Sequence, residues 1–149
     1  MKVFIGADYR GFDHKEELKR ELEKAGYTVI DCGAHEKHEG DDFNDPAIAV
    51  AKCVLAEPGS RGVLICDSAH GVTMQANRFL GIRAANADSE ESAVLSREHD
   101  DANVLCMSAH FMNGETMRGV ANAFLKTDFV NLERRVRRIK RLDERSDND

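Results

Sequence analysis

The sequence predicts an α/β fold in which five parallel strands form one sheet with helices on both faces. Short apolar runs alternate along the chain with longer segments of helical periodicity, which is typical of strands linked by crossover helices. The apolar runs are contiguous rather than alternating, as in strands that are buried on both faces. With 149 residues and no internal repeat, the chain fits a single domain over residues 1–149.

The first third of the chain contains two predicted strands and two predicted helices. Residues 3–5 form an apolar strand, and an amphipathic helix begins near Asp13 and ends at Gly26, a residue type that suits a helix C-terminus. Residues 27–32 form the second strand. The next helix begins at Asp45, because an aspartate N-cap followed by proline is a favoured helix start.

The remaining elements continue the alternation. Residues 62–65 form the central strand, because they are apolar without interruption. The later strands and helices are predicted at 72–78, 81–87, 89–99, 103–108 and 114–124, with Asp88 or Ser89 and then Asn113 or Gly114 as helix starts. A C-terminal helix of about 131–145 follows, and its apolar stripe is Leu132, Val136, Ile139 and Leu142.

Composition and charge exclude several classes of protein. The formal net charge of −6 argues against a general nucleic-acid binder, since such proteins need local basicity to neutralise phosphates. No apolar run approaches the length of a membrane span, and the N-terminus becomes charged too early for a signal peptide. The four cysteines show no C-x-x-C pairing, which favours reduced thiols and a cytoplasmic protein.

A chemically rich turn follows the central strand. It places a thiol at Cys66, a carboxylate at Asp67, a hydroxyl at Ser68 and an imidazole at His70, and it closes with Gly71. Ligands bind at the carboxyl ends of strands in open α/β sheets, and a helix starting near this glycine directs its free N–H groups to the same place. The thiol is either a base or nucleophile, or a small buried hydrophobic group; the neighbouring carboxylate is expected to raise its pKa.

Other candidates are weaker by themselves. Asp8 stands at the end of the first strand, as Cys66 does at the end of the central strand. His99 lies at a polar helix end, where a surface histidine interacting with the helix dipole is the simpler interpretation. His35 and His38 have metal-like spacing, but they lie in a polar loop without cysteine ligands, so we expect no metal site.

The C-terminal helix is strongly basic, with six lysines and arginines within residues 134–141. Arg134 and Arg138 lie one turn apart, a spacing that allows two guanidinium groups to converge on one phosphate. No aromatic residues are interleaved for base stacking. The pattern favours a small phosphorylated ligand, or the acidic surface of a partner subunit, over DNA.

A series of motifs in a fixed order carries a family resemblance. The motifs occupy residues 6–11, 64–71, 76–78, 81–84 and 95–104, followed by the pair Arg134 and Arg138. From residue 1 to about 142, the chain resembles the ribose-5-phosphate isomerase B / galactose-6-phosphate isomerase family. The resemblance implies a Rossmann-like three-layer sandwich and a homodimer or tetramer with active sites at the subunit interface. It also implies an aldose–ketose isomerisation of a phosphorylated sugar, of the ribose 5-phosphate/ribulose 5-phosphate type, through an enediolate, without cofactor or metal.

The resemblance also implies roles for individual residues. Cys66 would be the base that moves a proton between C1 and C2, Ser68 would supply a hydroxyl to the sugar oxygens, and Asp8 would orient the sugar. His99 would assist ring opening. The backbone N–H groups near Gly71 would stabilise the enediolate. The phosphate would be held by Arg134 and Arg138.

Several positions differ from the family's usual residues. Most of them belong to the expected substrate-binding set, which comprises Tyr9, Phe43, Asp67, His70, Gly71, Asp100 and His110. Tyr9 replaces a histidine, His110 replaces an arginine, and Phe43 replaces a tyrosine. Asp67 and Ala69 replace glycines, and Asp100 replaces an asparagine. These changes add carboxylates and remove a positive group, which predicts weaker binding of a phosphate dianion and leaves the identity of the sugar open.

Two other functions fit the same residues. The chain could be a partner-dependent or non-catalytic subunit of a hetero-oligomer like galactose-6-phosphate isomerase, acting with a second family subunit. It could also be a sugar-binding protein without turnover. Neither alternative requires a nucleic acid or a membrane as partner.

Overall fold

Five parallel strands form one sheet in the order β2-β1-β3-β5-β4 in the computed structural model, which describes residues 1–144. The strands are β1 (Lys2–Ala7), β2 (Thr28–Asp31), β3 (Arg61–Cys66), β4 (Ala84–Asn86) and β5 (Val104–Ser108). This confirms the predicted parallel five-stranded sheet. The central strand β3 lies between β1 and β5, and its last five residues are buried.

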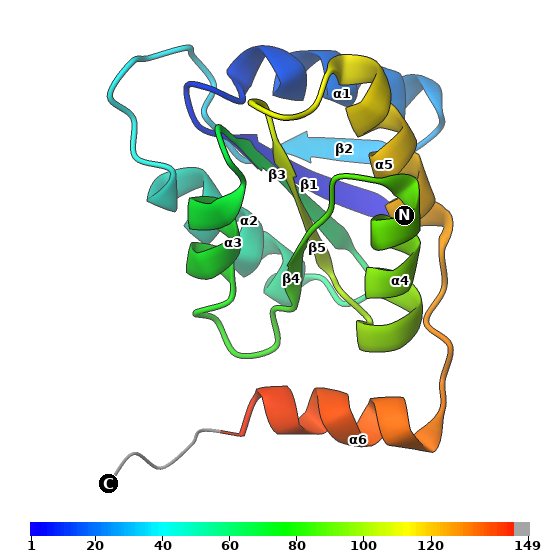
Figure 1. Ribbon diagram of the computed structural model, residues 1–149. Helices are drawn as coiled ribbons and strands as arrows, with labels where there is room; N and C mark the ends of the chain where they lie inside the picture. The colour runs from blue at the N-terminus through cyan, green and yellow to red at the C-terminus, as the bar shows by residue number, and fades with distance from the viewer. Residues whose placement is uncertain (145–149) are drawn as a thin grey trace, which may run out of the picture.

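Helices cover both faces of the sheet, as predicted (Figure 1). They are α1 (Phe12–Lys24), α2 (Asn44–Ala56), α3 (His70–Ala76), α4 (Glu90–Asp100), α5 (Gly114–Lys126) and α6 (Glu133–Leu142). One apolar core joins the sheet to α1, α4 and α5, and a second core joins its other face to α2 and α3. The result is a three-layer sandwich.

Several predicted boundaries were wrong by a few residues. Asp45 does not cap its helix, because Phe43 already has helical backbone angles and α2 begins at Asn44. The strand expected at 81–87 is shorter because the N–H group of Arg83 donates to the Asn103 side chain, not to a neighbouring strand. The helix expected at 72–78 runs two residues earlier as α3.

The C-terminal helix lies apart from the sandwich (Figure 1). It spans Glu133–Leu142 and not 131–145, because the backbone at Leu132 is extended; residue 145 lies outside the described residues. None of its residues is buried. Two hydrogen bonds attach this helix and the residue after it to the sandwich. Arg135 Nη1 donates to the Glu98 carbonyl at 2.9 Å, and the Gly81 N–H group donates to Asp143 Oδ1 at 3.0 Å.

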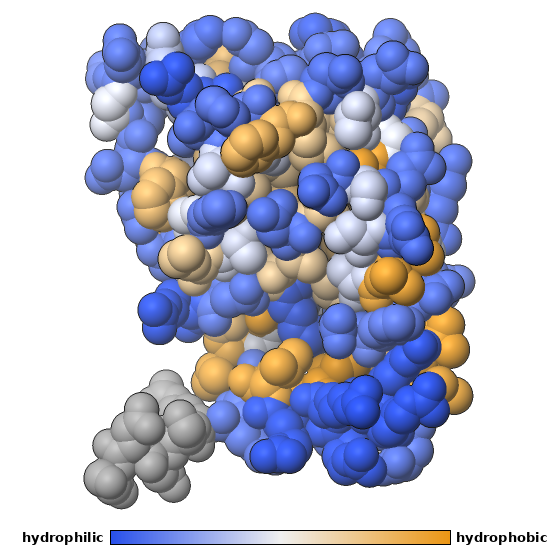
Figure 2. Space-filling view, viewed as in Figure 1, coloured by the Kyte–Doolittle hydropathy of each residue, from blue (hydrophilic) through white to orange (hydrophobic). Residues whose placement is uncertain are grey.

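The apolar stripe of α6 is only partly covered. Leu132 is 36% exposed and Leu142 is 63% exposed, and Leu80 in the neighbouring loop is 56% exposed. Figure 2 shows apolar side chains gathered between α6 and the rest of the molecule. No helix within residues 1–144 is long and apolar enough to cross a bilayer.

A buried ion pair holds the end of β2. The Lys15 side chain is fully buried, and its Nζ donates to Asp31 Oδ1 at 2.9 Å, to Asp31 Oδ2 at 2.8 Å and to the Ala34 carbonyl. Burial raises the pKa of the Asp31 carboxyl, but the bonds from Lys15 and from the Gly33 N–H group outweigh that effect, so the net pKa is lowered. The pair therefore favours the ionised carboxylate and fixes the start of the loop that follows β2.

We expect Lys15→Met to lower the free energy of unfolding by about 3 kcal/mol, because the change leaves the Asp31 carboxylate buried without its partner. Urea denaturation at neutral pH measures this loss. Lys19→Met is the matched control, since Lys19 lies 3.5 Å from the same carboxylate but is 30% exposed; its loss should stay below about 1 kcal/mol.

The contribution of the Asp31 carboxylate to the stability of the fold depends on pH. Because the folded-state pKa of Asp31 is lowered, its contribution is full above the ordinary value of 3.8 and disappears as the pH falls through the folded-state pKa. The gap between wild type and Lys15→Met should therefore narrow in acid. Equal losses for the two lysine variants would contradict this account of the buried pair.

Candidate functional site

Cys66 lies at the carboxyl end of β3, between the ends of β1 and β5. The strand register places Ala7 opposite Ile65 and Cys66 opposite Ser108. The Asp8 N–H group donates to the Ile65 carbonyl at 3.3 Å. The structure thus brings Asp8 and Cys66, two residues from distant parts of the sequence, to the same edge of the sheet.

The turn after Cys66 surrounds the thiol with backbone N–H groups. Ala69 has φ of 68°, a left-handed conformation that costs an L-residue roughly 1–2 kcal/mol, and α3 begins directly after it. The chain thereby folds back so that the N–H groups of Val72, Ala69 and Ser68 act on the sulfur. Burial raises the pKa of the Cys66 thiol and these N–H groups oppose the rise. The site can therefore hold a thiolate in a dry environment once it forms.

Among the carboxylates, Asp8 has the largest effect on the pKa of the thiol. Sequence reasoning expected Asp67 to raise the pKa of Cys66, but after burial the charge that contributes is that of Asp8. Asp67 is adjacent in sequence, yet its side chain is 57% exposed and extends outward. Burial also raises the pKa of the half-buried Asp8, against the N–H group of Gly11, which donates to Asp8 Oδ1 at 3.0 Å.

The end of β5 is bound to the same turn. The Ser108 hydroxyl donates to the Asp67 carbonyl at 2.6 Å, and the His110 N–H group donates to that carbonyl at 2.9 Å. His110 Nδ1 lies 3.7 Å from Asp67 Oδ1, with both side chains more than half exposed. His110 therefore stands beside Asp67 at the rim, where a protonated imidazole would offset the carboxylate charge.

Phe43 and Tyr9, two other predicted residues, each have a close neighbour in the structure. A Cβ on Gly71 would meet the Phe43 ring at 2.8 Å, so this turn and the start of α2 are in close contact. Tyr9 lies under Lys37, whose Nζ is 5.4 Å from the ring centroid. Lys37 was not predicted from the sequence, because it lies in a polar loop without a motif; only the structure places it near Tyr9.

A hollow of about 270 Å³ opens beside the turn at the ends of β3, β4 and β5. Its lining residues are Ser68, His70, Asn86, Asp88, Ser108 and Phe111. Ser68 and His70 were predicted, whereas Asn86 and Asp88 were identified in the sequence only as the end of a strand and a possible helix start. The hollow is lined largely by hydroxyl, amide and carboxylate groups, which suits a polyhydroxylated ligand.

The other predicted residues lie elsewhere in the chain's fold. His99 and Asp100 are exposed at the C-terminal end of α4, and Arg134 and Arg138 are exposed on α6. Because α4 leads into the start of β5, its last residues lie at the amino edge of the sheet, opposite the Cys66 turn (Figure 1). One copy of the chain therefore carries two separate groups of candidate residues.

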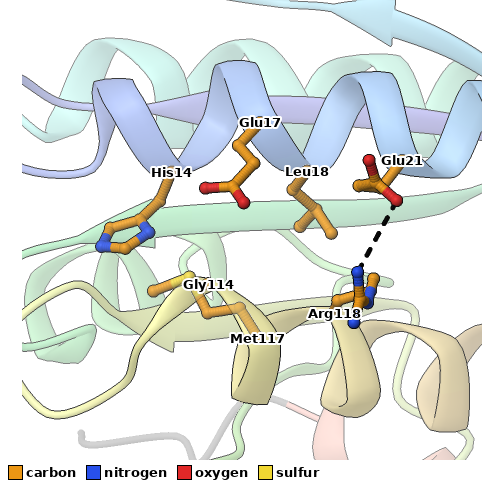
Figure 3. Close-up of a pocket in the computed structure, with 7 residues that line it drawn as sticks. All are labelled: His14, Glu17, Leu18, Glu21, Gly114, Met117 and Arg118. Carbon is orange, nitrogen blue, oxygen red and sulfur yellow. Dashed lines mark ion pairs between the residues drawn. The ribbon is translucent and has the colours of Figure 1, made fainter.

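The crevice between α1 and α5 is not a third candidate. Figure 3 shows His14, Glu17, Glu21 and Arg118 along it, with Arg118 Nη1 3.8 Å from Glu21 Oε2. Its volume is about 10 Å³, which is room for about one water molecule. It is a helix–helix seam with an ion pair at one end.

Comparison with known proteins gives a consistent result. The family described as Ribose/Galactose Isomerase matches residues 3–142. A probable ribose-5-phosphate isomerase B from Mycoplasma pneumoniae is 39% identical over 127 residues, covering 85% of this chain and 84% of the relative. A 4-deoxy-4-sulfo-D-erythrose isomerase from Clostridium sp. is 37% identical, covering 89% of this chain and 84% of the relative.

A solved structure supports the same relationship. The ribose-5-phosphate isomerase B of Mycoplasma genitalium with bound ribulose-5-phosphate superimposes with a TM-score of 0.91 at 35% identity. The match covers 95% of this chain and 93% of the other.

We expect Gly11→Ala to lower the free energy of unfolding by about 2 kcal/mol, because the new Cβ would lie 2.7 Å from the Ile65 carbonyl carbon, where backbone must move. Urea denaturation measures the loss. Gly114→Ala is the control, since its Cβ would meet only the flexible end of Glu17, at 3.0 Å. A Gly11→Ala protein as stable as the control would show that the loop after β1 is not held against β3.

Proposed function

The chain belongs to the ribose/galactose isomerase family, and from that premise we propose that it is an aldose–ketose isomerase acting on a sugar with a terminal anionic group. Ribose 5-phosphate and ribulose 5-phosphate are the first substrates to test, because relatives over most of this chain's length are named for that activity. The observation that carries the mechanism is the Cys66 thiol, buried at the carboxyl end of β3 and faced by three backbone N–H groups.

Cys66 is the base in this proposal. Isomerisation removes a proton from the carbon next to the carbonyl and returns it to the neighbouring carbon, so one group must accept and then donate a proton on the same face of the sugar. A buried thiolate with a raised pKa is scarce at neutral pH but strongly basic once formed. Asp8, beside it, is placed to orient a sugar hydroxyl.

The N–H groups of the turn stabilise the negative charge both before and after proton transfer. Before proton transfer they face the thiolate; after it, the sulfur is neutral and the negative charge lies on the enediolate oxygens. Preorganised donors of this kind contribute roughly 3 kcal/mol each to transition-state stabilisation. The Ser68 hydroxyl, at the adjacent hollow, is placed to exchange a proton with those oxygens.

The active site is completed by a second copy of the chain. His99, Arg134 and Arg138 lie at the opposite side of the same copy from Cys66, so one copy cannot bring them together. An isologous dimer would place these residues of one copy at the Cys66 turn of the other. The exposed apolar stripe of α6 supports such an interface. A homodimer or tetramer, and a cytoplasmic location, are part of this proposal.

The charges of the residues around Cys66 and of those on α6 orient the substrate. Asp8 and Asp67 make the Cys66 side acidic, whereas α6 presents a row of guanidinium groups. The anionic end of the sugar therefore points to Arg134 and Arg138 of the partner copy, and the carbonyl end points to Cys66. His99, on the same copy as these arginines, is placed to assist ring opening.

A sulfonated tetrose is the second candidate substrate. One relative is named 4-deoxy-4-sulfo-D-erythrose isomerase. A sulfonate carries one negative charge where a phosphate carries up to two, and the added carboxylate of Asp100, next to His99 at the end of α4, penalises a dianion more than a monoanion. The two sugars should be compared directly by kcat/KM.

We expect Cys66→Ala to lower the rate of solvent-deuterium exchange at C1 and C2 of the substrate by about a thousandfold, because the proton-transfer base is lost. NMR in deuterated buffer measures the exchange. Cys53→Ser is the control and should retain wild-type exchange. If wild type shows no exchange, and Cys66→Ala binds the sugar as tightly as wild type, the chain is a sugar-binding protein without turnover.

The same assay has a defined pH profile. Because the pKa of Cys66 is raised above its ordinary value of 9.0, the thiolate fraction rises throughout the neutral and mildly alkaline range. The value of kcat/KM should increase about tenfold per pH unit until that pKa is reached. A plateau beginning near pH 7 would show that the pKa of the Cys66 thiol is not raised in the assembled enzyme.

A complementation experiment tests the shared site. Cys66→Ala and Arg138→Ala should each be inactive, yet refolding them together in equal amounts should restore about one quarter of wild-type activity, because half of the dimers are mixed and each has one intact site. Native mass spectrometry verifies mixing, because the two substitutions remove different masses from the chain. No recovery from mixed dimers would place all catalytic residues within one copy, and activity only after adding a different family subunit would identify a hetero-oligomer.

A further inference from the structure

Two cysteines outside the candidate site lie next to each other. The sulfur atoms of Cys32 and Cys53 are 3.8 Å apart, although the residues are 21 positions apart in the chain. Cys32 directly follows β2, and Cys53 lies in the C-terminal half of α2. The sequence did not predict this contact, since the two residues form no C-x-x-C motif.

Exposure separates this pair from the other two cysteines. Cys32 and Cys53 are both partly exposed, whereas Cys66 and Cys106 are buried. Cys66 is only 4% exposed and Cys106 is fully buried. An oxidant in solution therefore reaches the pair first, and each thiol of the pair has a second thiol beside it to complete a disulfide.

We propose that Cys32 and Cys53 form a dithiol oxidation site, which hydrogen peroxide converts to an intramolecular disulfide before Cys66 reacts. One thiolate attacks a peroxide oxygen and breaks the O–O bond, giving a sulfenic acid and, after proton transfer, one water. The second thiol then displaces the hydroxyl from that sulfur, which forms the S–S bond and releases the second water. Two thiols are oxidised by two electrons in total, and one peroxide is reduced.

The environments of the two thiols predict the order in which they react. Burial, and then the proximity of Cys53, raise the pKa of Cys32 to about 12. Cys32 therefore stays protonated and reacts second, as the thiol that resolves the sulfenic acid on Cys53. The sulfurs must approach from 3.8 Å to about 2.05 Å.

The backbone holds Cys32 in place, so the disulfide forms by movement of Cys53. The Cys32 N–H group donates to the Ile5 carbonyl at 2.8 Å, and the preceding Asp31 is held by Lys15. Cys32 is thus anchored to the sheet, and the adjustment occurs at Cys53 and its helix. The disulfide would enclose residues 33–52, including Phe43 at the rim of the Cys66 turn, in a covalent loop.

Peptide mapping tests the proposal on the full-length protein. Trypsin places each cysteine in its own peptide, at 25–37 for Cys32, 53–61 for Cys53, 62–78 for Cys66 and 98–118 for Cys106. The folded protein is treated with hydrogen peroxide, free thiols are alkylated, and the digest is analysed by mass spectrometry without reduction.

We expect peptides 25–37 and 53–61 to be joined, with the loss of two hydrogen atoms, at a rate on the order of tenfold faster than any loss of alkylated 62–78. Reduction with a dithiol should restore both peptides. The Cys32→Ser protein should instead accumulate oxidised Cys53 without a cross-link. These outcomes do not require the isomerase activity, so they can be separated from a failure of the proposed function.

Two results would overturn the proposal. Oxidation of Cys66 while 25–37 and 53–61 remain reduced would show that exposure does not govern the order. Cross-links formed between two copies of the chain, instead of within one, would show that the two sulfurs do not close within a copy.

Discussion

The rest of the structure depends on the parallel pairing of β3 with β1 on one side and β5 on the other. Parallel strands end at the same edge, so this register alone brings Asp8, Cys66 and the residues after Ser108 together. Three backbone segments then join by hydrogen bonds, with Ala109 N–H donating to the Cys66 carbonyl at 2.9 Å. The chemistry at this edge follows from the sheet and needs no long-range loop to assemble it.

The sequence was sufficient to predict the sheet, the two helix layers and the gathering of Asp8 with Cys66. Contiguous apolar runs identify buried strands, and strand ends identify a common edge. The left-handed backbone at Ala69 was not predictable from residue type, because alanine disfavours it; its signal in the sequence is that Ala69 replaces a glycine of the family. The burial of Lys15 was also hidden, since a lysine in an amphipathic helix is ordinarily exposed.

The separation of the two groups of candidate residues follows from chain direction. In a βαβ unit each helix runs back toward the amino edge, so a residue at the end of α4, such as His99, lies far from the carboxyl edge. The family resemblance implies an active site at the subunit interface, and the fold separates His99 from Cys66 within one copy. The proposed dimer would bring His99 of one copy to Cys66 of the other, so the assembly and the reaction belong to one proposal.

The loose attachment of α6 affects the stability of a newly synthesised chain. A helix with no buried residue and with Leu142 63% exposed leaves apolar surface in water until something covers it. If α6 forms part of the proposed dimer interface, an unpaired copy would be prone to aggregation and proteolysis, and the thermal stability of the protein would rise with its concentration. In the proposed dimer, the cellular abundance of the protein would then depend in part on how quickly each chain meets another.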